Sequence, residues 1–266
     1  LFDLIDATPS GELHDVTSDQ FKPVVDACTL CDMCYSNKCP YVPPHDFNLD
    51  FPHLMLRARA VDAKKNGVDF AMGQLTQTDR NGTLAKPVAA LANWATSTEN
   101  KLVRPVMEAV LGVHHAAELP KYCGQTFCEE TAKKTITVNT TAPAYGRKAV
   151  LYATCFVNYN GPAVGHAARA VLAKNGIETA VLHPACCGMP QLEQGQIAEV
   201  VAKARQVVAG LMPYIDQGYD VVALTPSCAL MLKSEWPLLV PQTDPLLADI
   251  KKLAAATYDL SEYVMD

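Results

Sequence analysis

The hydrophobic pattern of the second half of the chain predicts strands that alternate with helices. Short apolar runs bounded by polar residues or glycine indicate buried strands at residues 148–154, 178–183 and 220–225. Amphipathic segments between these runs indicate helices at residues 161–175 and 191–217, the second interrupted near Pro213. Because strands that alternate with helices pair in parallel through right-handed crossovers, an α/β domain is expected over residues 147–266.

The first half of the chain has a helical pattern instead. Its clearest helix is predicted at residues 51–65, ending at Gly67. Apolar residues also recur at helical spacing over residues 84–94 and 102–111. A threonine-rich stretch with proline and glycine is interpreted as a linker. The pattern therefore predicts three parts, which are residues 1–66, a helical connector over 67–146, and the α/β domain over 147–266.

Composition narrows the classes of partner and location. The 266-residue chain has a formal net charge of -6 and no basic block, so a nucleic-acid partner is not expected. No run of about 18 apolar residues is present, so no transmembrane helix is expected, and no signal peptide is visible. The chain begins at Leu1 rather than Met, and its N-terminus is interpreted as processed or incomplete. Its ten clustered cysteines favour metal ligation in a reducing compartment over a disulfide framework.

The first group of cysteines, hereafter the N-terminal cysteines, has the spacing C-x2-C-x2-C-x4-C-P. It comprises Cys28, Cys31, Cys34 and Cys39, followed by Pro40. Two residues between thiolates allow a tight turn to direct both sulfurs at one inorganic centre. The run differs by one residue from the bacterial iron–sulfur spacing C-x2-C-x2-C-x3-C-P. Structural zinc prefers two well-separated C-x2-C pairs, so an iron–sulfur site is predicted, with zinc and disulfides as alternatives.

The second group, hereafter the strand-end cysteines, follows the three predicted strands. Cys155 comes after the first strand, Cys186 and Cys187 after the second, and Cys228 after the third. The carboxyl ends of parallel strands share one edge, where open α/β sheets bind ligands. We therefore expect these cysteines to converge on a second metal centre. The alternative for each is a buried thiol in an α/β core.

Other side chains of ligand type are interpreted as structural. Adjacent side chains on a helix diverge by about 100°, so joint metal ligation by His114 and His115 is not expected. Cys123 and Cys128 are interpreted as free structural thiols. His183 is expected to hydrogen-bond to the strand-end centre or tune it rather than bind it.

The order Cys155, Cys186-Cys187-Gly188 and Cys228 resembles the cysteine-rich CCG domain. This domain occurs in heterodisulfide reductase, in anaerobic glycerol-3-phosphate dehydrogenase, and in the iron–sulfur subunits of glycolate and lactate oxidases. The sequence CFVNYN at residues 155–160 is similar to the CCG-containing component of the glycerol-3-phosphate dehydrogenase. The resemblance covers most of the chain from about residue 20. It implies an α/β protein with a helical ferredoxin-like N-terminal part and a C-terminal, Rossmann-like parallel sheet.

Two departures from the family pattern affect the expected clusters. The family's motif ends in C-x2-C and provides five cysteines for a non-cubane cluster, whereas Met231 occupies the last position here. Four cysteines suit one [4Fe–4S] cubane or a modified site, with zinc as an alternative. Family members also carry an upstream cysteine motif and a second CCG domain. The chain is thus expected to be a piece of a longer polypeptide or a shortened member. With the upstream motif present, Cys39 would serve a second N-terminal [4Fe–4S] cluster.

The resemblance implies an iron–sulfur electron-transfer subunit of a multi-subunit oxidoreductase. Such a protein relays electrons between a flavoprotein dehydrogenase and a quinone, a disulfide or another carrier. No glycine-rich nucleotide fingerprint follows a strand, so no flavin or nicotinamide is expected within this chain. The alternatives are a catalytic disulfide or thiol reductase at the CCG cluster and a zinc-stabilised interaction module. The expected location is the cytoplasm, including the inner face of its membrane through a membrane-anchored partner.

Overall fold

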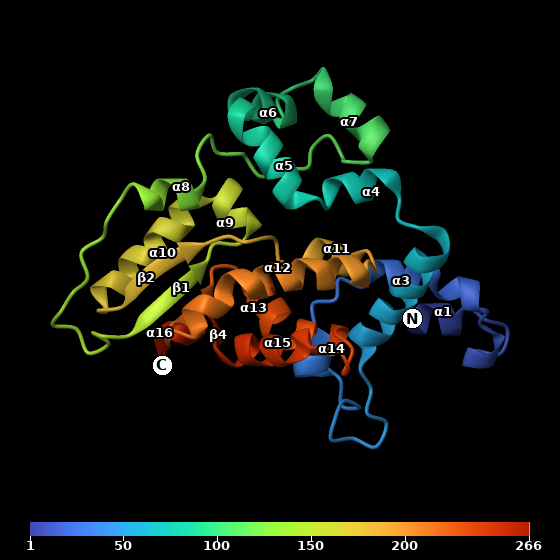
Figure 1. The fold of residues 1–266 in the computed structure, drawn as a ribbon. Helices are drawn as coiled ribbons and strands as arrows, with labels where there is room; N and C mark the ends of the chain where they lie inside the picture. Colours follow the sequence, from blue (N-terminus) through green and yellow to red (C-terminus); the bar gives the residue numbers. More distant parts are fainter. Residues whose placement is uncertain (266) are drawn as a thin grey trace. The chain divides into compact units, whose positions relative to one another are not determined.

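The computed structural model describes residues 1–265 (Figure 1). These residues divide into two compact units. The first unit comprises Leu1–Val68 and Gln191–Ile197, and the second comprises Asp69–Pro190 and the chain from Ala198 onward. The helical segment that begins at Asp69 therefore belongs to the same unit as the sheet.

The second unit is built on a parallel sheet, as predicted. Its strands in the described chain are β1 (Lys148–Tyr152), β2 (Glu178–Leu182), β3 (Asp220–Ala223) and β4 (Thr257–Asp259). Their order is β2-β1-β3-β4, and every pair is parallel. The chain passes from β1 outward to β2 and then returns to β3 on the other side of β1. The order thus reverses between β1 and β3, and such a reversal opens a crevice at the carboxyl edge of a sheet.

The three predicted strands are confirmed, and β4 is an addition. β1 and β3 are buried along almost their whole length, which explains their near-continuous apolar sequences. β4 has only three residues, Thr257–Asp259, and lacks an apolar run, so the hydrophobic pattern could not identify it.

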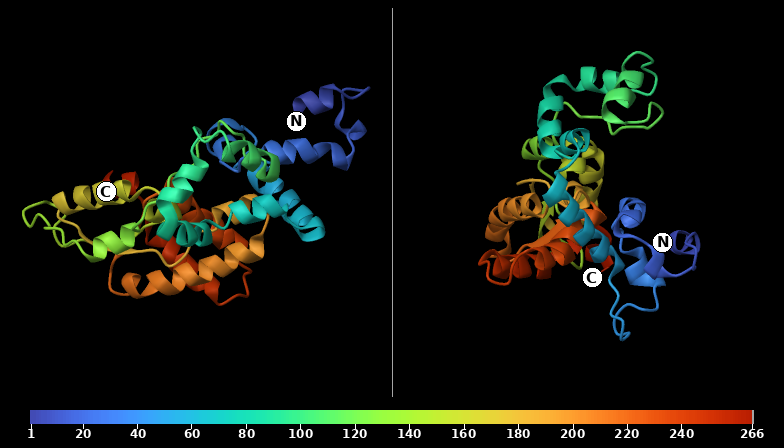
Figure 2. Two further views of the ribbon diagram at one scale, coloured as in Figure 1. Left: turned by 90° about the horizontal axis from the view of Figure 1, so that it is seen from above. Right: turned by 90° about the vertical axis from the view of Figure 1, so that its right-hand side faces the viewer.

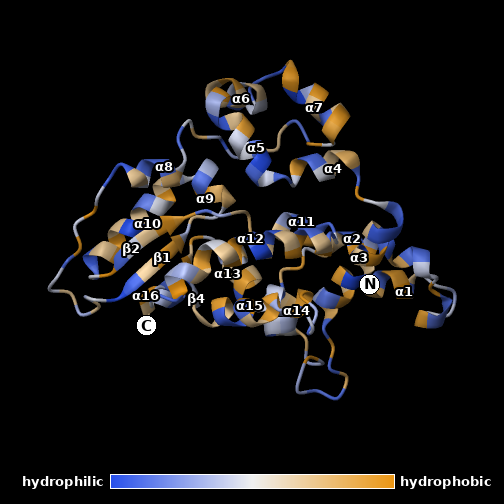
Figure 3. Ribbon diagram, viewed as in Figure 1, coloured by the Kyte–Doolittle hydropathy of each residue, from blue (hydrophilic) through white to orange (hydrophobic). Residues whose placement is uncertain are grey.

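Helices follow the strands as the pattern predicts. Those after β1 are α9 (Cys155–Tyr159), α10 (Pro162–Lys174), α11 (Met189–Glu193), α12 (Ile197–Ile215), α13 (Pro226–Leu230), α14 (Trp236–Leu239), α15 (Leu246–Ala255) and α16 (Leu260–Met265). A π-helical turn, η5 (Met231–Glu235), joins α13 to α14. α10 and α12 lie on opposite faces of the sheet (Figure 2). The helices mix hydrophobic and hydrophilic residues, as expected for helices with one buried side (Figure 3).

The expected break near Pro213 is wrong. Pro213 lies inside α12, whereas the interruption falls between α11 and α12. Gly195, in that gap, has a φ of +71°, a left-handed conformation that ends a helix. The positive φ of Gly195 therefore sets the boundary that the sequence pattern assigned to Pro213.

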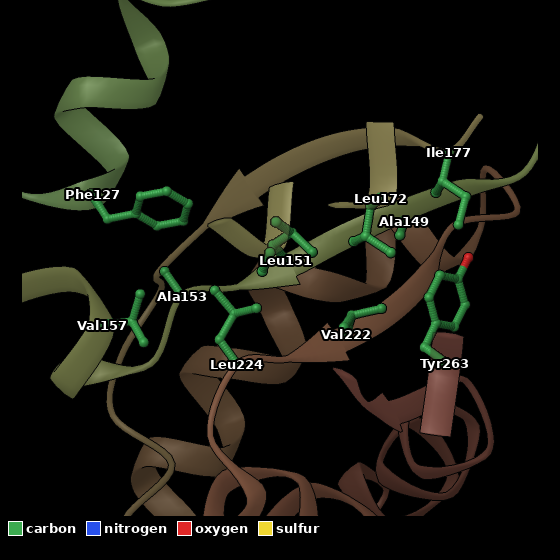
Figure 4. Close-up of a cluster of buried hydrophobic side chains, with 11 residues drawn as sticks. Phe127, Ala149, Leu151, Ala153, Val157, Leu172, Ile177, Val222, Leu224 and Tyr263 are labelled. Atoms are coloured by element: carbon green, nitrogen blue, oxygen red, sulfur yellow. The ribbon is translucent and has the colours of Figure 1, made fainter. Parts of the chain in front are cut away.

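One face of the sheet packs on a core shared by several helices. Leu151 of β1 and Val222 of β3 lie against Leu172 of α10 and Tyr263 of α16 (Figure 4). Phe127, fully buried, extends this core from α8 (Phe127–Ala132). α8 and α10 approach closely because α10 carries Gly165, where an added Cβ would lie 2.6 Å from the Phe127 ring.

The segment before β1 is helical, as predicted. Its elements are α4 (Phe70–Leu75), α5 (Thr78–Ala85), η4 (Lys86–Val88), α6 (Ala89–Thr96), α7 (Val103–Leu111) and α8. The single helix predicted at residues 84–94 is divided at η4. Pro87 lies in that 3₁₀ turn, and proline cannot donate the backbone hydrogen bond of a helix interior.

The first unit is made of short helices and one long one. They are α1 (Phe2–Asp6), the 3₁₀ turns η1 (Leu13–Asp15) and η2 (Ser18–Phe21), α2 (Lys22–Ala27), the π-helical turn η3 (Cys34–Lys38) and α3 (Phe51–Asn66). α3 confirms the helix predicted at residues 51–65. The Asp50 carboxylate accepts a hydrogen bond from the His53 amide at its start, and Gly67 ends it with a φ of +77°. Among the described residues, no helix has the length and apolar character needed to cross a membrane.

The close packing of α8 on α10 predicts the effect of enlarging Gly165. We expect Gly165→Ala to lower the free energy of unfolding by about 1–3 kcal/mol, because the new methyl group meets the buried Phe127 ring. Gly73→Ala in α4 is the matched control, since nothing lies within 4 Å of a Cβ at Gly73. The control should be neutral or stabilising by up to about 1 kcal/mol. Chemical unfolding measures both, and equal stabilities would contradict the packing argument.

Candidate metal centres

The strand-end cysteines lie together at the carboxyl edge of the sheet. Cys155 begins α9, Cys186 and Cys187 lie in the loop after β2, and Cys228 lies within α13. The Sγ atoms of Cys155 and Cys186 are 3.7 Å apart, and those of Cys187 and Cys228 are 3.3 Å apart. Cys186, Cys187 and Cys228 are buried, and Cys155 is half-buried. Residues that are distant in the sequence therefore present their thiols to one site, beside the reversal of strand order.

The sulfur positions differ from those of a tetrahedral zinc site. A zinc ion bound at about 2.3 Å by four sulfurs brings all of them to within roughly 3.8 Å of one another. Among the side chains that the structure describes, no three of these sulfurs all lie within 4.8 Å of one another. The thiols form a row of close pairs instead. The donor set is purely sulfur and more extended, and it fits an iron–sulfur centre better than a single zinc ion.

The burial of these thiols shapes their protonation. Hydrogen bonds from the Cys155 thiol and then from the Cys187 thiol hold the pKa of Cys186 well below its ordinary value. The same hydrogen bond to Cys186 raises the pKa of Cys155, and hydrogen bonds to Cys186 and Cys228 together with burial raise that of Cys187. One thiolate thus shares the protons of its neighbours. A bound cationic metal would offset the charge of the remaining thiolates, and binding would release their protons.

Asp79 of α5 connects two elements of this site. Its Oδ2 accepts a hydrogen bond from the backbone N–H of Cys186 at 2.6 Å, and its Oδ1 lies 2.8 Å from Nε2 of His183. The His183 side chain is only 5% exposed, and its ring packs against Tyr152 and Tyr159. The carboxylate therefore fixes both the orientation of His183 and the start of the Cys186–Cys187 loop. No sequence signal pointed to Asp79, because it lies 107 residues before Cys186.

Further hydrogen bonds hold the loops that carry the cysteines. Trp236 Nε1 donates to the carbonyl of Cys187 at 3.1 Å, and the Tyr152 hydroxyl donates to the carbonyl of Ala185 at 2.6 Å. Thr154 and Thr225 contact through their hydroxyl oxygens at 3.1 Å, shortly before Cys155 and Cys228 in the sequence. Thr154 is buried with a φ of +53°, which is a strained conformation for a β-branched residue. Such strain is found at functional sites, where the surrounding contacts maintain it.

The N-terminal cysteines lie in a wrapped loop of the first unit. Leu30 and Asp32, the residues between them, have φ values of +50° and +56°. Left-handed residues at both positions turn the backbone tightly between Cys28 and Cys34. Burial raises the pKa of Cys34, and the charges of Cys28 and Cys31 raise it further, so these thiolates influence one another. The loop can therefore present several sulfurs to one centre.

The extra residue before Cys39 is absorbed by a π-helical turn. η3 runs from Cys34 to Lys38, and the Cys39 amide donates to the Cys34 carbonyl at 2.8 Å. A five-residue hydrogen-bonded step is characteristic of a π-turn, and such turns occur frequently at functional sites. The C-x4-C spacing thus closes the loop with one more residue than an α-helical turn.

Arg59 of α3 supports the beginning of the same loop. Its Nη2 donates to the carbonyl of Val25 at 2.8 Å and also to the carbonyl of Cys28. These carbonyls lie at the end of α2, where a helix leaves acceptors unsatisfied. The basic residues of α3 were interpreted mainly as a solvated face, but Arg59 joins α2 to α3.

Cys123 and Cys128 lie outside both groups of cysteines. Burial raises the pKa of Cys128 to about 11, so its thiol stays protonated at neutral pH. The Cys123 thiol points its proton toward the Asn160 carbonyl, at 3.6 Å. These contacts agree with their interpretation as structural thiols.

Comparison with known proteins identifies a cysteine-rich domain in this chain. Residues 149–233 match the family model of the cysteine-rich domain CCG. The chain is 30% identical over 182 residues to the C component of anaerobic glycerol-3-phosphate dehydrogenase of Escherichia coli K12, which is 68% of this chain and 44% of that protein. It is 31% identical over 120 residues to lactate utilization protein A of Geobacillus kaustophilus, which is 45% of this chain and 48% of that protein. The chain thus spans less than half the length of these relatives. No solved structure matches it significantly.

The bridging role of Asp79 predicts that the strand-end site weakens without it. We expect Asp79→Ala to speed the loss of iron from this site to a chelator by about 10- to 100-fold, as removal of a supporting hydrogen bond does. In the metal-free protein, the buried Cys186 thiol should also react faster with a maleimide. Asp69→Ala is the control, since Asp69 caps α4 and has no hydrogen bond to the site among the contacts described. Equal rates in the two variants would contradict the role of Asp79.

Proposed function

We propose that this chain is an iron–sulfur electron-transfer subunit of a multi-subunit oxidoreductase. It carries a cysteine-rich CCG domain and is homologous to a component of anaerobic glycerol-3-phosphate dehydrogenase and to lactate utilization protein A. The observation that carries the proposal is the convergence of the strand-end cysteines at the sheet edge. A second cysteine run with near-ferredoxin spacing, in the same chain, is what a relay between centres requires.

The cysteines divide between the two centres. Cys28, Cys31 and Cys34 would hold a [4Fe–4S] cluster, with Cys39 serving the same cluster or a neighbouring one. The strand-end cysteines would hold one further iron–sulfur centre. When bound, such clusters take up and release single electrons at potentials that depend on burial and on hydrogen bonds to sulfur. In this proposal the first unit has a ferredoxin-like role and the sheet a Rossmann-like one.

The surrounding residues of the strand-end site would tune that centre. Cys186 and Cys187 have 0% and 2% of their surface exposed, so water is largely excluded from them. Asp79 and Trp236 orient the backbone on either side of the Cys186–Cys187 pair. Burial and then the charge of Cys187 raise the pKa of Tyr152, which keeps its hydroxyl protonated as a donor. These residues hold the sulfurs in a fixed, dry environment, which limits reorganisation on electron transfer.

The burial of the strand-end sulfurs favours a relay over a catalytic disulfide reductase. A disulfide substrate must reach the reacting centre directly, whereas an electron can pass through a few ångströms of packed protein. The names of the relatives concern glycerol-3-phosphate dehydrogenase and lactate utilization. We accordingly propose a flavoprotein dehydrogenase as one partner and a quinone or another carrier beyond it. The proposed location is the cytoplasm, at its membrane where a membrane-anchored partner is present.

Cysteine variants test the two-centre proposal. We expect anaerobically prepared protein to contain iron and sulfide and to show two paramagnetic species on reduction. Cys31→Ser should remove the species of the N-terminal cluster, and Cys187→Ser should remove that of the strand-end centre. Cys123→Ser is the control and should remove neither. Zinc without iron at the strand-end site would instead support an interaction module and contradict the relay.

An acceptor assay separates relay from catalysis. With an artificial electron donor, the relay predicts reduction of small redox dyes but negligible turnover of disulfides. Cys187→Ser should abolish dye reduction through the strand-end centre while the N-terminal cluster remains reducible. Rapid disulfide turnover that is lost in Cys187→Ser would overturn the relay and support the catalytic alternative.

A further inference from the structure

The pair His114 and His115 lies in a turn, not on a helix. α7 ends at Leu111, and Gly112 follows with a φ of +67°. The expectation that the two side chains diverge by a helical rotation is therefore wrong. Their rings lie side by side, with centroids 4.4 Å apart. Both rings contact Glu108, which lies in the last turn of α7.

These three residues bring their metal-binding atoms close together. One Glu108 carboxylate oxygen lies 2.7 Å from His115 Nδ1, and the other lies 3.9 Å from His114 Nε2. All three ligand atoms fall within 4.8 Å of one another, the only such group of three or more His, Cys, Asp or Glu side chains among the described residues. The side chains are 39–65% exposed, so an ion can reach them from solution. The group does not involve any of the cysteines.

A buried arginine fixes the turn that carries the histidines. The Arg104 side chain is 1% exposed and lies beneath the turn. Its Nε donates to the carbonyl of His115 at 3.0 Å, and its Nη2 donates to the carbonyls of His114 and Ala117 at 2.7 and 2.6 Å. Glu108 also accepts from the His115 backbone N–H, at 3.3 Å. The backbone on which the three ligands stand is thus ordered without a metal, which lowers the entropic cost of binding one.

We propose that Glu108, His114 and His115 form a binding site for a divalent transition-metal ion of the zinc type. Two imidazoles and one carboxylate suit zinc, cobalt or nickel, whereas calcium and magnesium prefer oxygen donors alone. The hydrogen bond from His115 keeps the pKa of the Glu108 carboxyl below its ordinary value, so the carboxylate is ionised at neutral pH. Three protein ligands leave a fourth position for water or for a ligand from another molecule.

Binding at His114 has one identifiable cost. The Ala116 N–H donates to His114 Nδ1 at 3.2 Å, which places the proton of the neutral ring on Nε2. Coordination through Nε2 requires the proton to move to Nδ1 and this hydrogen bond to break. Ala116 is exposed, so water can replace the lost acceptor. The loss of one such hydrogen bond is small compared with coordination by three ligands.

Zinc binding to the iron-loaded, full-length chain tests the site. The protein is treated with a chelator that leaves the clusters intact, and Zn²⁺ is then added in a calorimeter. We expect one equivalent of Zn²⁺ to bind, and X-ray absorption at the zinc edge to show nitrogen and oxygen neighbours with two imidazoles. Glu108→Gln and His115→Gln should each weaken this binding by about tenfold or more, since they remove a direct ligand.

Two control variants separate this site from other metal-binding groups. His14→Gln removes an exposed histidine that pairs with Asp15 at 3.4 Å, and it should leave zinc binding unchanged. Cys123→Ser with Cys128→Ser removes the thiols outside both cysteine groups and should also change nothing. Circular dichroism checks that each variant is folded. Absence of binding, a sulfur shell around zinc, or unchanged affinity in Glu108→Gln and His115→Gln would each overturn the proposal. The iron content of the protein reports separately on the proposed relay.

Discussion

Parallel pairing of β1 with both β2 and β3 is the constraint on which the strand-end site depends. Parallel strands place their carboxyl ends at one edge, so the residues that follow each strand become neighbours. The reversal of strand order at β1 then separates the loops enough to leave room between them. Cys155 and Cys228 stand on either side of this reversal, and the Cys186–Cys187 loop reaches it from the outer strand.

Desolvation imposes a second requirement on that edge. Buried thiols are tolerated, but several buried thiolates are not, unless a cation or hydrogen-bond donors offset their charge. The low pKa of Cys186 beside the raised pKa values of its neighbours shows the metal-free compromise, with one anion served by the others. The polar contacts of Asp79 and Trp236 satisfy the backbone of the loop rather than the sulfurs. The sulfurs are thereby left to one another and to a metal centre.

The two groups of cysteines are organised in different ways. The N-terminal cysteines occupy a single loop, in which left-handed residues and a π-turn shape the backbone locally. The strand-end cysteines rely on contacts across the second unit, including one from α5. A local loop can be exposed, and Cys31 is exposed, whereas the strand-end site is enclosed by the elements that create it. The enclosed site is the one better suited to a fixed potential.

The sequence by itself determined the strands β1 to β3, the long helix α3 and both groups of cysteines. It could do so because apolar runs, helical periodicity and cysteine spacing are local properties of the chain. Only the tertiary structure revealed Asp79, Arg59 and the Glu108–His114–His115 group, because their partners are distant in sequence or depend on where a helix stops. Pro213 illustrates the same limit, since the break in the helix came from the backbone conformation of Gly195 instead. Local pattern decided which elements form, and packing decided which side chains meet.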